Sequence, residues 1–370
     1  MKLHIPDNIV AVKPYPPGKT QAELEREYGI TGSIKLASNE NAWGPSPKAV
    51  RALRSALTAI HRYPDSSSHE LVHGLAAKFG FDVDEIVLGN GSNEVIEFLV
   101  KAFVREGDEV ISSHPSFLMY QKFVQVHGGE NYIVPLKDMC HDLKVIQEMI
   151  SEKTRLVFLD NPNNPTGTSL KSLDLYTFFS KVPESVIIVL DEAYVDFMDN
   201  DKQLDIFSLI RNTKGRCPIV SLRTFSKVYG LPGLRIGFGL MSREIAGCLN
   251  KVRQPFNINH MAQVGALAAL EDNEYYQYIV DVTRRGRAHL HAEVESLGCT
   301  VYPSQANFLL IKVQGVGQAL YEALLHRGVI VRPMGAYGFS DCIRVTVGTE
   351  EENSRFLEEF SGCLKDLNYV

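Results

Sequence analysis

The sequence of 370 residues has few cysteines and no paired ones. Its six cysteines, at positions 140, 217, 248, 299, 342 and 363, are scattered, and no two of them form a CxxC motif. This spacing predicts neither a disulfide framework nor a cysteine-rich zinc site. Reduced thiols, as in cytosolic proteins, are the simpler interpretation.

Long apolar runs and an excess of positive charge are also missing. The first residues contain no hydrophobic signal-peptide core, and runs such as Val186–Leu190 are far shorter than the ~20 residues that span a bilayer. Lysine and arginine total 38 against 44 acidic residues, which gives a net charge of −6. We therefore expect a cytoplasmic protein that binds neither nucleic acid nor membranes.

Short apolar segments alternate with helical patterns between residues 38 and 270. The segments expected to form strands are Ile86–Leu88, Glu109–Ile111, Arg155–Leu159, Val186–Leu190 and Ile219–Leu222. Near-continuous apolar strands separated by helices indicate an α/β fold with a mostly parallel central sheet and helices on both faces. This pattern predicts a large domain over residues 38–270.

The pattern changes after residue 270. Strands are expected at Asn307–Ile311 and Ile343–Val347, with a helix near Leu320–Leu325, so residues 271–370 should form a smaller α/β domain. The N-terminal segment 1–37 is expected to pack with this small domain. Within it, Thr20 and Glu23 form a capping-box pattern that predicts the start of a helix.

Polar segments follow the carboxyl ends of the expected strands, where ligands bind in open α/β sheets. The glycine-rich stretch 89–93 leads into a helix, so its N–H groups and the helix dipole suit an anion. A plain glycine-rich turn is the alternative interpretation. The stretch 160–167 contains two X-Pro bonds and a glycine, which make a rigid loop that directs Asn164 over the sheet edge.

Two ionisable side chains follow the next two strands. Asp191 ends an apolar strand, where a buried carboxylate is costly without a cationic partner; a helix-capping aspartate is the alternative. Lys227 follows one βα unit later. A lysine is usually solvated, but one that is desolvated near other cations becomes a Schiff-base nucleophile. Together these features predict an anion site, a buried acid and a reactive lysine that converge.

In these motifs the sequence resembles the fold-type-I pyridoxal-phosphate aminotransferases, and among them the histidinol-phosphate aminotransferase family. The resemblance covers essentially the whole chain. Its strongest motifs are Asn163–Gly167, Asp191–Tyr194, and Ser226–Lys227 with Arg235; the others are Pro14–Gly18, Leu36–Asn41, Arg62–Asp65 and Ile343–Thr349. The resemblance implies the fold-type-I transferase fold, with pyridoxal 5'-phosphate as the cofactor.

The resemblance also implies roles around that cofactor. Lys227 would form the Schiff base with the cofactor aldehyde and later move the substrate proton, and Asp191 would pair with the pyridine nitrogen. Tyr194, the third catalytic residue, and Asn164 would hydrogen-bond the 3-oxygen, while the ring of Phe117 would stack on the pyridine. The residues that would hold the phosphate are Ser92, Asn93, Thr224, Ser226 and Arg235.

The remaining matches concern the substrates and the assembly. Tyr63 resembles a tyrosine that reaches the phosphate in the partner subunit, which implies a homodimer. Tyr15, Arg332 and Arg344 match positions that bind substrate anions. The implied reaction is transamination between histidinol phosphate and 2-oxoglutarate, with glutamate as the other member of that pair, in histidine biosynthesis.

Three alternatives stay open at this stage. An aromatic amino-acid aminotransferase is one, because arginines that bind phosphate also bind carboxylate. A pyridoxal-phosphate decarboxylase of an amino-acid phosphate is another, because the sequence does not show which bond at Cα stands perpendicular to the ring. A zinc hydrolase is the remote one, because His69, Glu70 and His73 fit the HExxH pattern, with Glu94 as a possible third ligand.

Overall fold

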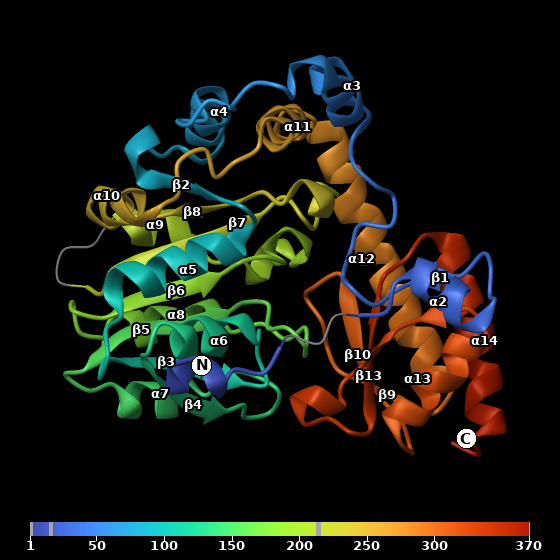
Figure 1. Cartoon of the computed structure of the whole chain (residues 1–370). Coiled ribbons are helices and arrows are strands. Elements are labelled where there is room, and N and C mark those ends of the chain that lie inside the picture. The colour runs from blue at the N-terminus through green and yellow to red at the C-terminus, as the bar shows by residue number, and fades with distance from the viewer. Residues whose placement is uncertain (1–2, 15–17, 212–215, 370) are drawn as a thin grey trace.

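The computed structural model describes residues 3–14, 18–211 and 216–369. A large body is built around a central sheet, and a smaller body lies beside it (Figure 1). The helices are α1 (Asp7–Val10), α2 (Gln21–Tyr28), α3 (Pro47–Ala56), α4 (His69–Phe79), α5 (Ser92–Phe103), α6 (Met119–Val126), α7 (Leu143–Met149), α8 (Ser172–Phe179), α9 (Ile206–Arg211), α10 (Arg243–Val252), α11 (His260–Leu270), α12 (Asn273–Ser296), α13 (Gly317–His326) and α14 (Glu350–Asp366). The strands are β1 (Ile34–Lys35), β2 (Ile86–Gly89), β3 (Glu109–His114), β4 (Glu130–Pro135), β5 (Thr154–Asp160), β6 (Ile187–Asp191), β7 (Ile219–Thr224), β8 (Gly237–Leu240), β9 (Thr300–Val301), β10 (Phe308–Lys312), β11 (Val329–Ile330), β12 (Arg332–Pro333) and β13 (Cys342–Thr346).

The large sheet confirms the predicted α/β class. Within the described residues its seven strands have the order β2-β8-β7-β6-β5-β3-β4. The strands from β7 to β4 are parallel to one another, whereas β8 is antiparallel to both of its neighbours. The five strands expected in this domain all form, each within two or three residues of its predicted ends.

The central strands are buried on both faces. On β5, Leu156 and Phe158 pack with the cluster that includes α5, α6 and α10, whereas Val157 and Leu159 pack with the cluster on the other face, which includes α4 and α8. This two-sided burial explains the near-continuous apolar runs of the sequence. Asp160 and Asp191, which line the cavity, stand at the carboxyl ends of β5 and β6.

Two strands of this sheet were not predicted. β4 is an edge strand with only one buried residue, so it lacks an apolar run. β8 has the sequence Gly-Phe-Gly-Leu, and a Cβ on Gly237 would collide with the backbone of Ser92. Glycine lowers strand propensity but permits this close approach.

The smaller body contains a four-stranded sheet of order β12-β13-β10-β9, in which neighbouring strands are antiparallel. The N-terminal segment joins both bodies. β1 pairs in parallel with β11 of the smaller body, whereas α1 lies against α6 of the large body, where Asn8 Nδ2 donates to the carbonyl oxygens of Gln125 and Val126 at 3.3 and 3.0 Å.

The helix that follows Thr20 begins as predicted. The Thr20 hydroxyl accepts from the Glu23 backbone N–H at 3.2 Å, and the Glu23 carboxylate accepts from the Thr20 N–H at 2.7 Å. The helix ends at Gly29, which has a φ of 69°. None of the described helices has the length and apolar character that a membrane span requires.

Candidate active site

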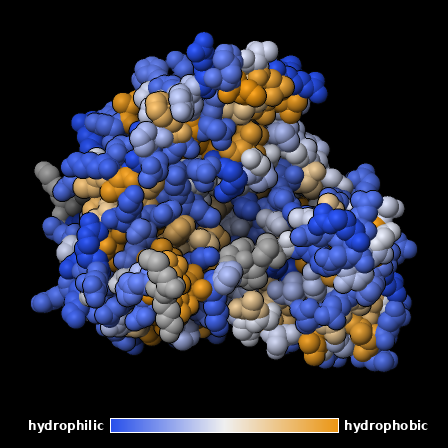
Figure 2. Space-filling view, viewed as in Figure 1, coloured by the Kyte–Doolittle hydropathy of each residue, from blue (hydrophilic) through white to orange (hydrophobic). Residues whose placement is uncertain are grey.

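A cavity of about 290 Å³ lies where the carboxyl ends of the large sheet face the smaller body. Of the predicted site residues that the structure describes, all line it except Tyr63. Tyr15 lies outside the described residues. Tyr63 is 84% exposed and stacks on Phe256, with ring centroids 4.9 Å apart, away from this cavity. The space-filling view shows hydrophilic residues around the hollow between the two bodies (Figure 2).

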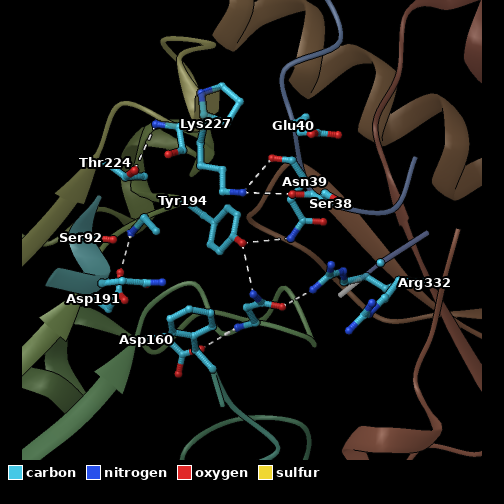
Figure 3. Close-up of a pocket in the computed structure, with 18 of the residues that line it drawn as sticks. Ser38, Asn39, Glu40, Ser92, Asp160, Asp191, Tyr194, Thr224, Lys227 and Arg332 are labelled. Carbon is cyan, nitrogen blue, oxygen red and sulfur yellow. Dashed lines mark hydrogen bonds between the residues drawn. The ribbon is translucent and has the colours of Figure 1, made fainter. Parts of the chain in front are cut away.

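Lys227 reaches into the cavity from the loop after β7. Its Nζ donates to the backbone oxygens of Ser38 and Asn39 at 3.2 and 3.0 Å (Figure 3). Burial lowers the pKa of Lys227 to about 7, and the positive charge of Arg344 acts in the same direction. A substantial fraction of this amine is therefore neutral, and nucleophilic, near neutral pH.

Asp191 ends β6 at the floor of the cavity and is buried. Its carboxylate accepts from the Tyr120 hydroxyl at 2.8 Å and from the Ala193 N–H at 3.1 Å. Burial raises the pKa of Asp191 to about 7. No cation among the described residues forms an ion pair with it, so a cationic ligand would satisfy this buried acid.

Tyr194 lies between Lys227 and the two arginines of the smaller body (Figure 3). Its hydroxyl oxygen accepts from Asn39 Nδ2 at 2.9 Å and from Asn164 Nδ2 at 3.2 Å, and burial raises its pKa to about 12. Because a hydroxyl has two lone pairs and one hydrogen, these two contacts leave the phenolic hydrogen available to a ligand in the cavity. Asn164 in turn accepts from Arg344 Nη1.

The beginning of α5 lines one side of the cavity. Ser92 and Asn93 form the first turn of α5, whose N-terminus carries positive dipole charge. Gly91, directly before it, has a φ of 79°, and a Cβ there would come within 2.5 Å of Arg235 Nη2. Thr224 and Ser226 complete this side of the cavity, and the Thr224 hydroxyl accepts from the Ser226 N–H at 3.1 Å.

The two predicted substrate arginines come from neighbouring strands of the smaller body. Arg332 on β12 is the register partner of Arg344 on β13, so both point to the same side of the sheet. Arg344 is buried, donates to the Ala37 carbonyl at 2.9 Å, and lies over the Phe308 ring at 5.2 Å. Two cationic side chains therefore face the end of the cavity opposite α5.

Sequence reasoning missed several residues that line the cavity. They are Ser38, Asn39, Glu40, Tyr120, Asp160 and Tyr337. The segment 38–40 belongs to a motif of the resemblance, but nothing local shows that it crosses the cavity. Asp160 could have been found, because it ends β5 just as Asp191 ends β6, and the two are in register.

The HExxH stretch forms the start of α4, away from this cavity. His69 and His73 have ring centroids 3.9 Å apart, and His73 Nδ1 contacts the backbone oxygen of His69 at 2.8 Å. Glu94 instead accepts from Asn257 Nδ2 at 2.7 Å. Within the described part of the chain, no three His, Cys, Asp or Glu side chains are grouped as metal ligands.

The sheet, the smaller body and this cavity define the fold-type-I class of pyridoxal-phosphate enzymes. Within that class the chain belongs to the aminotransferase class I and II family, whose profile matches residues 31–360. Because the chain belongs to this family, the zinc-hydrolase alternative from the HExxH pattern is wrong.

Individual relatives resemble the chain over nearly its full length. It is 62% identical to the histidinol-phosphate aminotransferase of Desulfotalea psychrophila, over 100% of this chain and 98% of that protein. It is 46% identical to histidinol-phosphate aminotransferase 2 of Carboxydothermus hydrogenoformans, over 96% and 98%. The crystal structure of the Sinorhizobium meliloti histidinol-phosphate aminotransferase with pyridoxal-5'-phosphate superimposes with a TM-score of 0.91 at 27% identity, covering 99% of both chains.

Proposed function

We propose that this protein is a histidinol-phosphate aminotransferase, which transfers an amino group between histidinol phosphate and 2-oxoglutarate. The convergence of Lys227, Asp191 and the N-terminus of α5 in one cavity carries the proposal for the chemistry. The 62% identity over the whole chain to a histidinol-phosphate aminotransferase supports the choice of substrate.

The cavity fits pyridoxal 5'-phosphate. That cofactor supplies an aldehyde that condenses with amines and a protonated ring that takes up electrons from the substrate. Asp191, a buried carboxylate without a cationic partner among the described residues, would hold the ring nitrogen in its protonated form. The α5 N-terminus and Arg235 would hold the phosphate, Tyr194 and Asn164 would bind the 3-oxygen, and the Phe117 ring would lie against the pyridine.

Lys227 supplies both the amine and the proton transfer. With a pKa of about 7, its Nζ exchanges readily between the neutral and protonated forms near neutral pH. A group of this kind can take a proton from a substrate carbon and return it at another position. Its contacts with Ser38 and Asn39 keep the Nζ inside the cavity rather than in solvent.

Arg332 and Arg344 would bind the anionic ends of the substrates. Histidinol phosphate carries a phosphate and no carboxylate, whereas glutamate and 2-oxoglutarate carry two carboxylates. A guanidinium group can form paired hydrogen bonds with either anion, so the same two arginines can serve both half-reactions. Tyr15 is proposed to close over this end of the cavity from the N-terminal segment.

We also propose that the active protein is a homodimer. Tyr63 is an exposed aromatic residue that takes no part in its own cavity, and the nearby side chains of Leu57, Ile60 and Phe256 are exposed as well. Apolar surface lies over α3, next to this segment (Figure 2). Exposed apolar residues that gather in one region are typical of subunit interfaces. In the dimer, Tyr63 would reach the phosphate in the partner subunit.

Domain organisation and location complete the proposal. Residues 38–270 would form the cofactor domain and residues 271–370 the small domain, with segment 1–37 attached to it through β1. α12 begins at Asn273 and runs from the large body into the smaller one (Figure 1). All six cysteines are free thiols, which supports a cytoplasmic location.

A comparison of amino donors tests the substrate assignment. We expect kcat/KM to be highest for histidinol phosphate when that donor, phenylalanine, tyrosine and threonine phosphate are each supplied with 2-oxoglutarate. Lys227→Ala serves as the inactive control. Release of carbon dioxide from threonine phosphate, or a preference for phenylalanine or tyrosine, would contradict the proposal and favour one of the two alternatives within the fold.

A further inference from the structure

A buried histidine–aspartate pair lies at the cofactor side of the cavity, where Asp160 is part of the lining. His141, just before α7, is buried, and its Nε2 lies 3.0 Å from Asp160 Oδ1 and 3.1 Å from the Asp160 backbone oxygen. Its Nδ1 contacts the Ser113 hydroxyl at 2.7 Å. Because a carboxylate only accepts hydrogen bonds, Nε2 must carry the hydrogen, and the imidazole is thereby fixed in orientation.

Asp160 uses both carboxylate oxygens to hold the loop that carries Asn164. Oδ2 accepts from the Asn164 backbone N–H at 2.8 Å. Oδ1 accepts from the Ser116 hydroxyl at 2.9 Å and from Asn163 Nδ2 at 3.2 Å, in addition to His141. An ionised carboxylate that accepts several hydrogen bonds holds its donors more firmly than a neutral group would.

The loop anchored in this way aims the Asn164 side chain. Asn164 Nδ2 donates to the Tyr194 hydroxyl, and its Oδ1 accepts from Arg344, so one amide joins the cofactor side of the cavity to the substrate side. A small shift of the Asn164 backbone would therefore disturb both neighbours.

Asp160 also lies beside the second buried carboxylate of the cavity, Asp191. Asp160 and Asp191 end adjacent strands in register, and the charge of Asp160 contributes to the raised pKa of Asp191. Two buried carboxylates side by side repel each other. His141 Nε2, 3.0 Å from Asp160 Oδ1, supplies a hydrogen bond that stabilises this carboxylate beside Asp191.

We propose that Asp160, held by His141, is a positioning residue for transamination that acts by fixing Asn164 against Tyr194 and Arg344. The proposal deepens the proposed function and rests on it for the identity of the cofactor. It does not depend on which amino donor is preferred.

A double-mutant cycle between Asp160→Asn and Asn164→Ala tests whether Asp160 acts through Asn164. In Asp160→Asn one carboxylate oxygen is replaced by an NH₂ group, which accepts no hydrogen bond, so the donors that faced this oxygen lose their acceptor. We expect about a tenfold higher dissociation constant for the cofactor and about a tenfold lower kcat at saturating cofactor. In the Asn164→Ala background the same change should add less than about twofold to either quantity, because the group it positions is absent.

Glu109→Gln is the matched control. Glu109 is another buried carboxylate of this sheet, at the start of β3, where it accepts from the Ser151 and Thr154 hydroxyls at 2.6 and 3.3 Å. The Glu109→Gln variant should have a lower melting temperature, with an unchanged dissociation constant for the cofactor and an unchanged kcat. If Asp160→Asn behaves in the same way as this control, or if its effects multiply fully with those of Asn164→Ala, the proposal is wrong.

Two His141 variants provide a second test that does not depend on the folding of Asp160→Asn. His141→Gln keeps an N–H donor near Asp160, whereas His141→Phe removes it while preserving bulk. We expect the glutamine variant to retain cofactor affinity within about threefold and the phenylalanine variant to lose about tenfold. Equal behaviour of the two variants would overturn the role of the pair. The cofactor titration uses no substrate, so it separates this proposal from the choice of histidinol phosphate.

Discussion

Two residues of the cavity, Lys227 and Asp191, are buried in a way that disfavours their ionised forms as long as no ligand is bound. Burial lowers the pKa of Lys227 to about 7 and raises that of Asp191 to about 7. Each shift means that the ionised form is less stable in the folded protein than in the unfolded chain. A site of this kind costs stability in the absence of its cofactor.

The first prediction concerns this cost in the cofactor-free protein. Between about pH 7 and about pH 10.5 the unfolded chain keeps the Lys227 proton that the folded protein loses, so the lysine destabilises the fold more as the pH falls through this window. We expect Lys227→Met to raise the melting temperature of the cofactor-free protein at neutral pH by about 2 °C or more. Calorimetry from about pH 7 to about pH 10.5 should show this gain shrinking with rising pH.

Asp191→Asn is the companion variant with the opposite pH dependence. The folded protein retains the Asp191 proton between about pH 4 and about pH 7, so the carboxylate destabilises the fold increasingly as the pH rises through that range. The variant should therefore gain stability over the unmodified protein as the pH rises to about 7. If the stability difference between each variant and the unmodified protein were the same at all pH values, burial would not set the charge of Lys227 or Asp191.

The second prediction concerns Arg344. Arg344→Lys keeps the positive charge but loses the planar fork that contacts Asn164 and Ala37. We expect KM to rise about tenfold or more in both half-reactions, for histidinol phosphate and for 2-oxoglutarate. Stopped-flow measurement of each half-reaction checks this. Unchanged constants for both substrates would remove Arg344 from the anion site.

At the scale of elements, the start of α5 and the turn before it make the proposed phosphate site. Gly91 supplies a positive φ that the turn requires and leaves room for the guanidinium of Arg235. A helix N-terminus alone is a weak anion site, but the adjacent arginine adds a full charge. The conformation of this turn and the position of the Arg235 charge therefore both depend on Gly91.

The third prediction separates these two contributions. Gly91→Ala should weaken cofactor binding about tenfold or more, because the new Cβ displaces Arg235 in addition to straining the backbone. Gly107→Ala is the matched control, since its φ of 83° imposes similar strain but its Cβ would have no neighbour within 4 Å. Both variants should lose stability, and only Gly91→Ala should lose cofactor affinity. Equal cofactor affinities would exclude Arg235 from phosphate binding.

At the scale of the whole molecule, the cavity is assembled from segments that are far apart in the chain. Asn39 and Thr346, which exchange hydrogen bonds, are 307 residues apart in the sequence. Arg287 on α12 ties the two bodies together, because its Nη1 donates to the backbone oxygens of Phe197 and Ala306 at 3.1 and 3.0 Å. The relative placement of the two bodies thus decides the distance between the cofactor site and the substrate arginines.

The fourth prediction addresses the proposed homodimer. If Tyr63 completes the cavity of the partner subunit, mixing Tyr63→Ala with Lys227→Ala should restore activity, because one of the two sites in each mixed dimer then contains both residues. We expect recovery to about a quarter of the unmodified activity after random subunit exchange. Exchange is verified by differently tagged subunits. If Tyr63→Ala is inactive by itself and full exchange recovers no activity, Tyr63 serves only its own subunit.

The sequence by itself determined the central strands, the capped helix α2 and the positions of Asp191 and Lys227 after the ends of two of those strands. These features depend on local patterns: apolar runs for strands buried on both faces, a capping box for a helix start, and polar residues at strand ends. The tertiary structure decided the rest. It set β8 antiparallel between β2 and β7, brought Asn39 to Tyr194, placed Arg332 opposite Arg344, and paired His141 with Asp160. Each of these depends on contacts between segments distant in the sequence, and local propensity holds no information about such contacts.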